Sequence, residues 1–130
     1  MPQEQVDRKE NLLRRVSEHL IRDDGTLSSS AFKQGGSWET NISVDVESLT
    51  DRQTSVDRAG RSGFFLAVTK AQSVFSLDFD VRHDRQSDNQ AHALIIGTND
   101  KATSKRLAAN FSVIDGVKSR NPIEHTGTEG

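Results

Sequence analysis

Four histidines are the residues best suited to acid–base or metal chemistry, because imidazole titrates near neutral pH and is a common metal ligand. They are His19, His83, His92 and His125. His92 differs from the others, since Ala91 and Ala93 flank it at the start of an apolar segment and leave room beside the ring. A histidine that is hydrogen-bonded at a strand edge explains the same pattern. We keep His92 as a candidate catalytic residue, with the structural alternative beside it.

Acidic residues near two of the histidines raise the question of a metal site. One such set is His83, Asp84, Asp88 and His92. Imidazole and carboxylate ligands together suit zinc, iron or manganese, but this spacing matches no specific metal motif and a solvated loop explains it equally well. Asp23-Asp24-Gly25 lacks the alternating oxygen ligands of a calcium loop and predicts a turn. We therefore expect neither a metal site nor a cofactor.

Three consecutive serines, Ser28, Ser29 and Ser30, could supply a nucleophile with His19 or His92 as its base. Serine hydrolases commonly place the nucleophile on a constrained Gly-x-Ser-x-Gly turn, which this sequence lacks. Helix capping explains the serines better, with one turn that carries residues 31 and 32.

Two adjacent arginines, Arg14 and Arg15, lie near His19 and could bind an anionic ligand, because guanidinium pairs with phosphate or carboxylate through two hydrogen bonds. A charged helix face, with Glu10 and Glu18 as partners, is the alternative. The candidate catalytic residues are thus His19, His92 and Arg15. The candidate ligand-binding residues are Arg14, Ser29 and Ser30.

The elements that must position these residues follow from apolar periodicity. Residues 12–21 have helical spacing and predict an amphipathic helix, although a short strand fits too. Strands are predicted at residues 42–46, 63–68, 77–81, 91–97 and 111–114, short helical segments at 28–32 and 70–75, and a helix at 101–110 with its cap at Asn99-Asp100. These elements indicate an α+β fold, with a small, mainly antiparallel sheet that one or two helices cover on one side. The expected core residues are Phe65, Leu66, Val68, Leu77, Phe79, Val81, Leu94 and Ile96.

Length and composition bound the answer further. The chain has 130 residues, 32% of them hydrophobic, and a net charge of −2 with both signs interspersed, which argues against a nucleic-acid partner. We expect one globular domain at residues 12–115 between flexible segments at 1–11 and 116–130. No apolar run is long enough to span a bilayer and no signal peptide is evident, so a soluble, cytoplasmic protein is expected. The lack of cysteine excludes disulfides, thiolate zinc sites and cysteine nucleophiles.

Several of these segments together resemble a family of small uncharacterised bacterial proteins. In that family an Arg-Arg-aliphatic start precedes a histidine, a Ser-Ser-Ala-Phe segment and a late His-Ala-Leu-Ile strand. The matching residues are Leu13, Arg14, Arg15, His19, Ser29, Ser30, Ala31, Phe32, His92, Ala93 and Leu94. The resemblance implies a bacterial origin. The order of Arg15, residues 28–30 and Glu124 is also similar to that of the NAD-binding residues in compact ADP-ribosyltransferase-like folds.

For function, we expect a non-enzymatic binding or accessory module of a bacterial system, such as a defence system or a toxin–antitoxin pair. Its partner would be a protein, and the oligomeric state stays open. The alternative is a small ADP-ribosyltransferase-like or nuclease-like enzyme, acting on a nucleotide or phosphodiester through His19, His92 and Arg15. That enzyme requires the two histidines to share one site, because acid–base catalysis needs hydrogen-bond reach to a common substrate.

Overall fold

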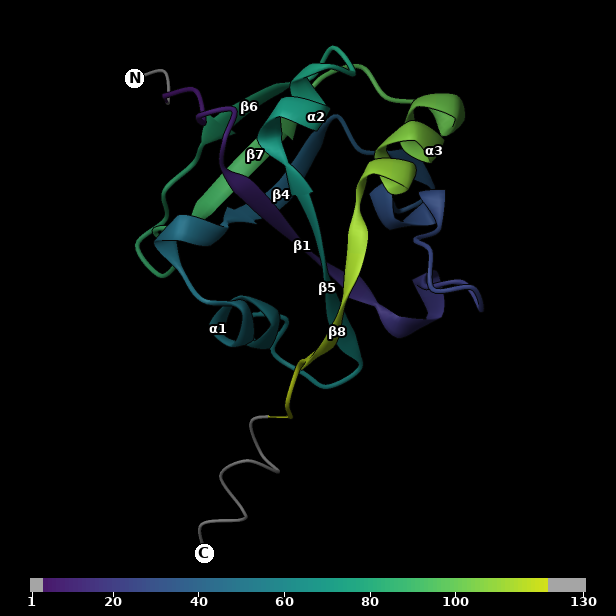
Figure 1. Ribbon diagram of the computed structural model, residues 1–130, viewed down its shortest axis with the longest axis vertical. Coiled ribbons are helices and arrows are strands. Elements are labelled where there is room, and N and C mark those ends of the chain that lie inside the picture. The colour runs from purple at the N-terminus through teal and green to yellow at the C-terminus, as the bar shows by residue number, and fades with distance from the viewer. Residues whose placement is uncertain (1–3, 122–130) are drawn as a thin grey trace, which may run out of the picture.

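A computed structural model describes residues 4–121, in which a six-stranded antiparallel sheet has the order β6-β7-β4-β1-β5-β8 (Figure 1). Its strands are β1 (Asn11–Ser17), β4 (Asn41–Val46), β5 (Phe64–Lys70), β6 (Asp80–His83), β7 (His92–Ile96) and β8 (Ser112–Lys118). The α-helices are α1 (Arg52–Asp57), α2 (Ala71–Phe75) and α3 (Lys101–Asn110); the short 3-10 helices are η1 (Glu18–Leu20), η2 (Ser29–Phe32) and η3 (Glu47–Leu49). A separate two-stranded ribbon joins β2 (Lys33–Gln34) to β3 (Ser37–Trp38). The predicted α+β class with a mainly antiparallel sheet is confirmed.

Both faces of the sheet are covered, whereas the sequence suggested cover on one side. Leu12 and Leu13 are neighbours on β1, so their side chains point to opposite faces, and both are fully buried. One face packs against α2, α3 and η2, and the other carries a smaller core of Leu13, Leu66 and Val56 beneath α1. Figure 1 shows α1 well separated from α2 and α3. Adjacent apolar residues in the central strands require this arrangement, because each face then needs its own cover.

The predicted N-terminal helix is wrong, and the strand alternative is right. β1 pairs with β5 along its whole length, from Asn11 opposite Lys70 to Ser17 opposite Phe64. A spacing of four residues, as between Leu12 and Val16, fits one face of a helix and one face of a strand equally well. Pairing with strands far along the chain settled what the local pattern left open.

The segment before β1 is part of the fold, which corrects the expected flexible region 1–11 for its described residues. Val6 is 2% exposed and its amide donates to the Val81 carbonyl at 2.8 Å. The amide of His83 donates to the Glu4 carbonyl at 2.9 Å. Residues 4–6 therefore lie along the outer edge of β6. The prediction missed this because one apolar residue among polar ones gives no periodic signal.

The first described residues of the expected tail at 116–130 are part of the fold, which corrects that prediction for residues 116–120. β8 continues to Lys118, Ser119 is 5% exposed, and Arg120 Nη2 lies 2.6 Å from Asp57 Oδ2 on α1. The rest of that tail, with His125 and Glu124, lies outside the described residues. The ADP-ribosyltransferase comparison therefore lacks its glutamate in the part of the chain that the structure describes.

Local signals for caps predicted their elements correctly. Asp100 accepts a hydrogen bond from the Thr103 amide at 2.8 Å and begins α3, and Ser28 accepts from the Ser30 amide at 3.2 Å before η2.

The core prediction is mixed. Leu66, Phe79 and Val81 are buried, and Phe65, Val68, Leu77 and Leu94 are partly buried. The predicted burial of Ile96 is wrong, since Ile96 is 37% exposed and its neighbour Ile95 is buried. Four consecutive apolar residues do not show which face of a strand turns inward.

Candidate functional site

The structure does not bring His19 and His92 together. His92 pairs with Asp45, which pairs with Leu13, so His92 is level with the start of β1. His19 lies beyond the other end of that strand, in η1, where its Nδ1 is 2.8 Å from Ser17 Oγ. The four residue-to-residue steps from Leu13 to Ser17 alone span about 13 Å of strand. One substrate proton cannot lie within hydrogen-bond reach of both rings.

His92 is buried at the junction of the loop 84–91 with β7. Its Nδ1 lies 3.0 Å from the carboxylate of Asp84 and 3.1 Å from the Asp84 main-chain carbonyl. Both are acceptors, so Nδ1 is the protonated nitrogen and donates. His83 pairs with Ala93 and so belongs to the opposite face of the sheet, where burial lowers its pKa, and Asp88 is exposed. The histidines and acids of this loop therefore do not gather around one point.

Arg14 ties the sheet to the segment after η1. Its guanidinium donates to the carbonyls of Ser43 and Ala31 at 2.9 and 2.8 Å, and to Glu39 Oε1 at 2.7 Å. It also lies over the ring of Phe32, 5.6 Å from the ring centre, and burial lowers its pKa. With its donors directed into the protein, Arg14 serves packing, which corrects its assignment to ligand binding.

Arg15 lies on the other face, in a cluster around Asp45. The Asp45 carboxylate is fully buried, and its Oδ2 accepts from Arg15 Nη1 at 3.0 Å and from Arg58 Nη1 at 2.9 Å. The same oxygen accepts from Ser55 Oγ at 2.6 Å, and Oδ1 accepts from Asn89 Nδ2 at 2.8 Å. This Asp45 cluster connects β4 to β1, α1 and the loop before β7.

The chemistry of the Asp45 cluster is that of an anchor. Burial alone would raise the pKa of Asp45, but hydrogen bonds from Ser55 and Asn89 and the charges of two arginines outweigh it, so this pKa is lowered. A buried carboxylate that already accepts four hydrogen bonds and has a lowered pKa has little affinity for a further proton, so Asp45 is a poor general base. Arg15 therefore has a structural partner. The sequence contains one signal for the Asp45 cluster, namely an aspartate within the predicted alternating strand at residues 42–46.

A basic hollow opens where residues 22–29 approach α3. Its volume is about 370 Å³, and it is lined by Arg22, Thr26, Leu27, Ser29, Lys105, Ala108 and Ala109. Within residues 4–121, neither Arg22 nor Lys105 has a carboxylate within ion-pair distance of 4 Å. Hydrogen bonds from Thr26 and, more weakly, the charge of Arg22 lower the pKa of nearby Asp24, which is exposed. The hollow thus presents two cations, neither of which is in direct contact with a carboxylate among residues 4–121.

The lining of the basic hollow suits an anionic group. Leu27 and Ala108 form an apolar floor, while Ser29 and Thr26 add hydroxyl groups beside the two cations. Of the sequence candidates, only Ser29 lies in this hollow, because Ser30 is exposed outside it. Arg22 and Lys105 were missed, since single exposed charges carry no pattern.

No protein-family model, no curated protein and no solved structure matches this chain. None of the helices within residues 4–121 has the length and apolar content that a membrane crossing requires.

Proposed function

We propose that this chain is a non-enzymatic binding module, and that its basic hollow holds an anionic group of a partner protein. The observation that carries this proposal is the pair Arg22 and Lys105, which line the hollow with Ser29 and have no carboxylate within 4 Å among residues 4–121. Arginine and lysine with adjacent hydroxyls form charge-assisted hydrogen bonds to carboxylate or phosphate.

The elements around the hollow support binding because they fix its shape. Ser29 begins η2 behind the Ser28 cap, and η2 packs on α3, which supplies Lys105. Leu107 and Ala108, which follow Lys105 on α3, are both buried and secure that helix. Since less freedom is lost when the site is already formed, more of the contact energy appears as affinity.

We further propose that the module is an accessory part of a bacterial system, in keeping with the family resemblance, and that it acts in the cytoplasm. The absence of cysteine and the mixed surface charge are compatible with that compartment. Defence and toxin–antitoxin systems are the settings in which we would test it first.

A small enzyme acting on a nucleotide or phosphodiester is the second candidate, and one observation favours it. Asp84 orients His92 through Nδ1, as a carboxylate does for a general base. His92 lies level with Asp45 on the α1 face, whereas the floor of the basic hollow belongs to the core on the opposite face. The enzyme would therefore need a separate substrate site near His92.

Titration of the ¹⁵N-labelled protein with two tripeptides tests the proposal. The acidic peptide Ac-Leu-Glu-Leu-NH2 should shift the amide signals of Ser29 and Lys105. Lys105→Gln should weaken the binding of this peptide by about two- to fivefold, because Lys105 is exposed and an exposed ion pair contributes at most about 1 kcal/mol. Lys101→Gln, an exposed lysine on the same helix, is the matched control and should change little. Equal affinity in both variants would contradict the proposal. Hydrolysis of bis-p-nitrophenyl phosphate that His92→Ala abolishes and Lys105→Gln leaves intact would favour the enzyme.

A further inference from the structure

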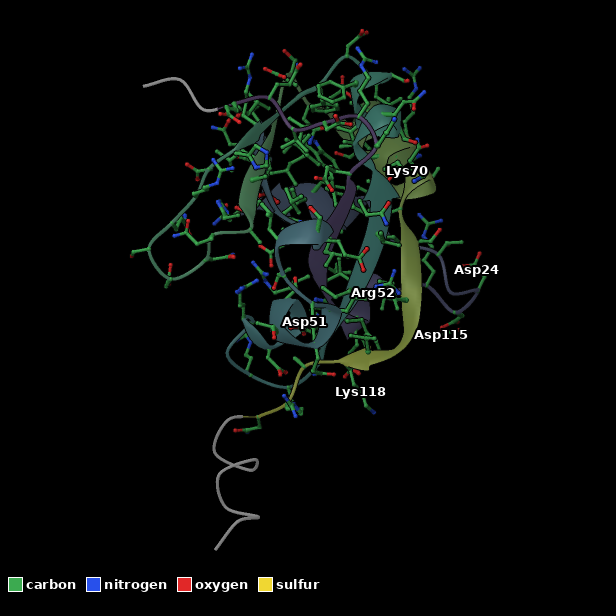
Figure 2. The ribbon with its side chains drawn as sticks, turned by 60° about the vertical axis from the view of Figure 1, so that its left-hand side comes forward. Asp24, Asp51, Arg52, Lys70, Asp115 and Lys118 are labelled. Carbon is green, nitrogen blue, oxygen red and sulfur yellow. The ribbon has the colours of Figure 1, made fainter. Side chains whose placement is uncertain are left out.

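A second hollow lies across the turn at residues 21–27 from the basic one. Its volume is about 350 Å³, and it is lined by Glu18, Ile21, Gly25, Phe65, Val113, Ile114, Asp115 and Gly116. Figure 2 shows Asp115 on β8 and Asp24 on the neighbouring turn at the same side of the molecule. Ile21 lines this acidic hollow and its bridge partner Leu27 lines the basic hollow, so one narrow turn separates the two.

A large irregularity in β8 creates the acidic hollow. Phe65 pairs with Lys118 and Ala67 with Val113, so residues 114–117 of β8 stand opposite Leu66 alone. Residues 114–117 leave the regular pairing, and Gly116 adopts a φ of +78°, which glycine tolerates better than other residues. Bulges of this kind redirect side chains and end strand pairing at specific places. Here the bulge places Asp115 on the rim of the hollow.

The acidic hollow combines two carboxylates with an apolar floor. Glu18 and Asp115 are exposed, and neither has a basic partner within 4 Å among residues 4–121. Ile21, Phe65 and Val113 beneath them are partly buried. A lysine or arginine matches this pattern, because its aliphatic stem covers apolar surface while its charged end reaches the carboxylates.

We propose that the acidic hollow holds a lysine or arginine from an extended segment of the partner protein, whose acidic group occupies the basic hollow. This inference rests on the proposed binding function. The two hollows then bind one segment that carries both a positive and a negative side chain, one on each side of the turn at residues 21–27. Complementary charges of both signs select a partner and its direction, since a reversed segment brings like charges together.

The same pair of tripeptides tests the acidic hollow separately. Ac-Leu-Lys-Leu-NH2 should shift the signals of Phe65 and Gly116, and Ac-Leu-Glu-Leu-NH2 should not. The double variant Glu18→Gln/Asp115→Asn should weaken the lysine peptide at least tenfold, whereas Asp88→Asn, in a distant exposed loop, should leave it unchanged. Equal response to both peptides, or no response, overturns this inference. Failure of the proposed function gives a different result, namely no shift of the Ser29 and Lys105 amide signals when the glutamate peptide is added.

Joint recognition is tested by linking the two tripeptides through Gly-Ser spacers of increasing length. At a matching length the linked peptide should bind at least tenfold more tightly than either half, because the second contact becomes intramolecular. No gain at any length, in either direction, would overturn joint recognition. Sedimentation of the protein alone covers the remaining occupant. If the protein forms dimers, and if both Lys105→Gln and Glu18→Gln/Asp115→Asn make them dissociate, then a second copy and not another protein fills the hollows.

Discussion

Replacing Asp45 with alanine should destabilise the protein by about 3 kcal/mol. The change removes the acceptor of four hydrogen bonds, two of them from guanidinium groups, and each guanidinium nitrogen keeps one weaker acceptor at 3.1 Å. Removing one partner of a buried ion pair costs about 3–5 kcal/mol. The side chains of Arg15 and Arg58 are 22% and 24% exposed, so both can regain water, and this places the expected cost near the lower end of the range.

Urea denaturation measures this cost directly. The matched control is Asp80→Ala, because Asp80 pairs with Arg82 at 2.7 Å but both side chains are more than one third exposed. Exposed pairs contribute only about 0–1 kcal/mol. A loss of about 3 kcal/mol also corresponds to a melting temperature lower by roughly 10 °C for a domain of this size. If Asp45→Ala and Asp80→Ala cost the same, the Asp45 cluster is not an anchor.

The pH dependence of the same difference gives a second check. The pKa of Asp45 is lowered in the folded state, so its contribution is complete above the unfolded value of about 3.9. The contribution is lost as the pH falls through the folded pKa. The advantage of the wild type over Asp45→Ala should therefore be constant near neutral pH and shrink progressively below about pH 4. An advantage that grows on acidification would contradict the assigned charge state.

The remaining predictions use the same denaturation assay. His92→Ala should cost about 1–3 kcal/mol, because it leaves the acceptors of Asp84 unpaired, and full stability would refute this structural role. Val6→Ala should cost about 2 kcal/mol if residues 4–6 are docked, and a change below about 0.5 kcal/mol would mean that they are loose. Gly97→Ala should cost about 1–3 kcal/mol, since its new Cβ would lie 2.7 Å from the ring of Phe79. In a protein that already carries Phe79→Leu, Gly97→Ala should cost less stability than it does in the wild type. Strict additivity of the two costs would exclude the clash.

The fold was predictable wherever a local signal is sufficient. The cap at Asp100 defines α3, and the apolar run of β5 could only be a central strand. β1 was ambiguous because its spacing fits two periods, and only pairing with β4 and β5 decides between them. The docking of Val6 was beyond local reasoning, since its partner Val81 lies far along the chain.

The site was less predictable than the fold. Arg15, His92 and Ser29 were all candidates from the sequence, but they belong to different surroundings in the structure. Histidines and arginines draw attention because of their chemistry, whereas what they do depends on the neighbours that folding brings to them. Lys105 and Asp115 matter for the opposite reason, since folding leaves them without a partner of opposite charge within 4 Å in the described chain.

The two borders of the sheet have consequences for how this protein behaves in a crowded solution. An exposed border strand can capture a matching strand from another molecule and start aggregation. Residues 4–6 occupy the free side of β6, and the bulge at 114–117 interrupts the regular hydrogen-bonding edge of β8. Loss of the first ten residues would therefore remove more than a few contacts. It would expose the hydrogen-bonding edge of β6 to other molecules. The truncated protein should therefore precipitate at concentrations at which the intact chain stays in solution.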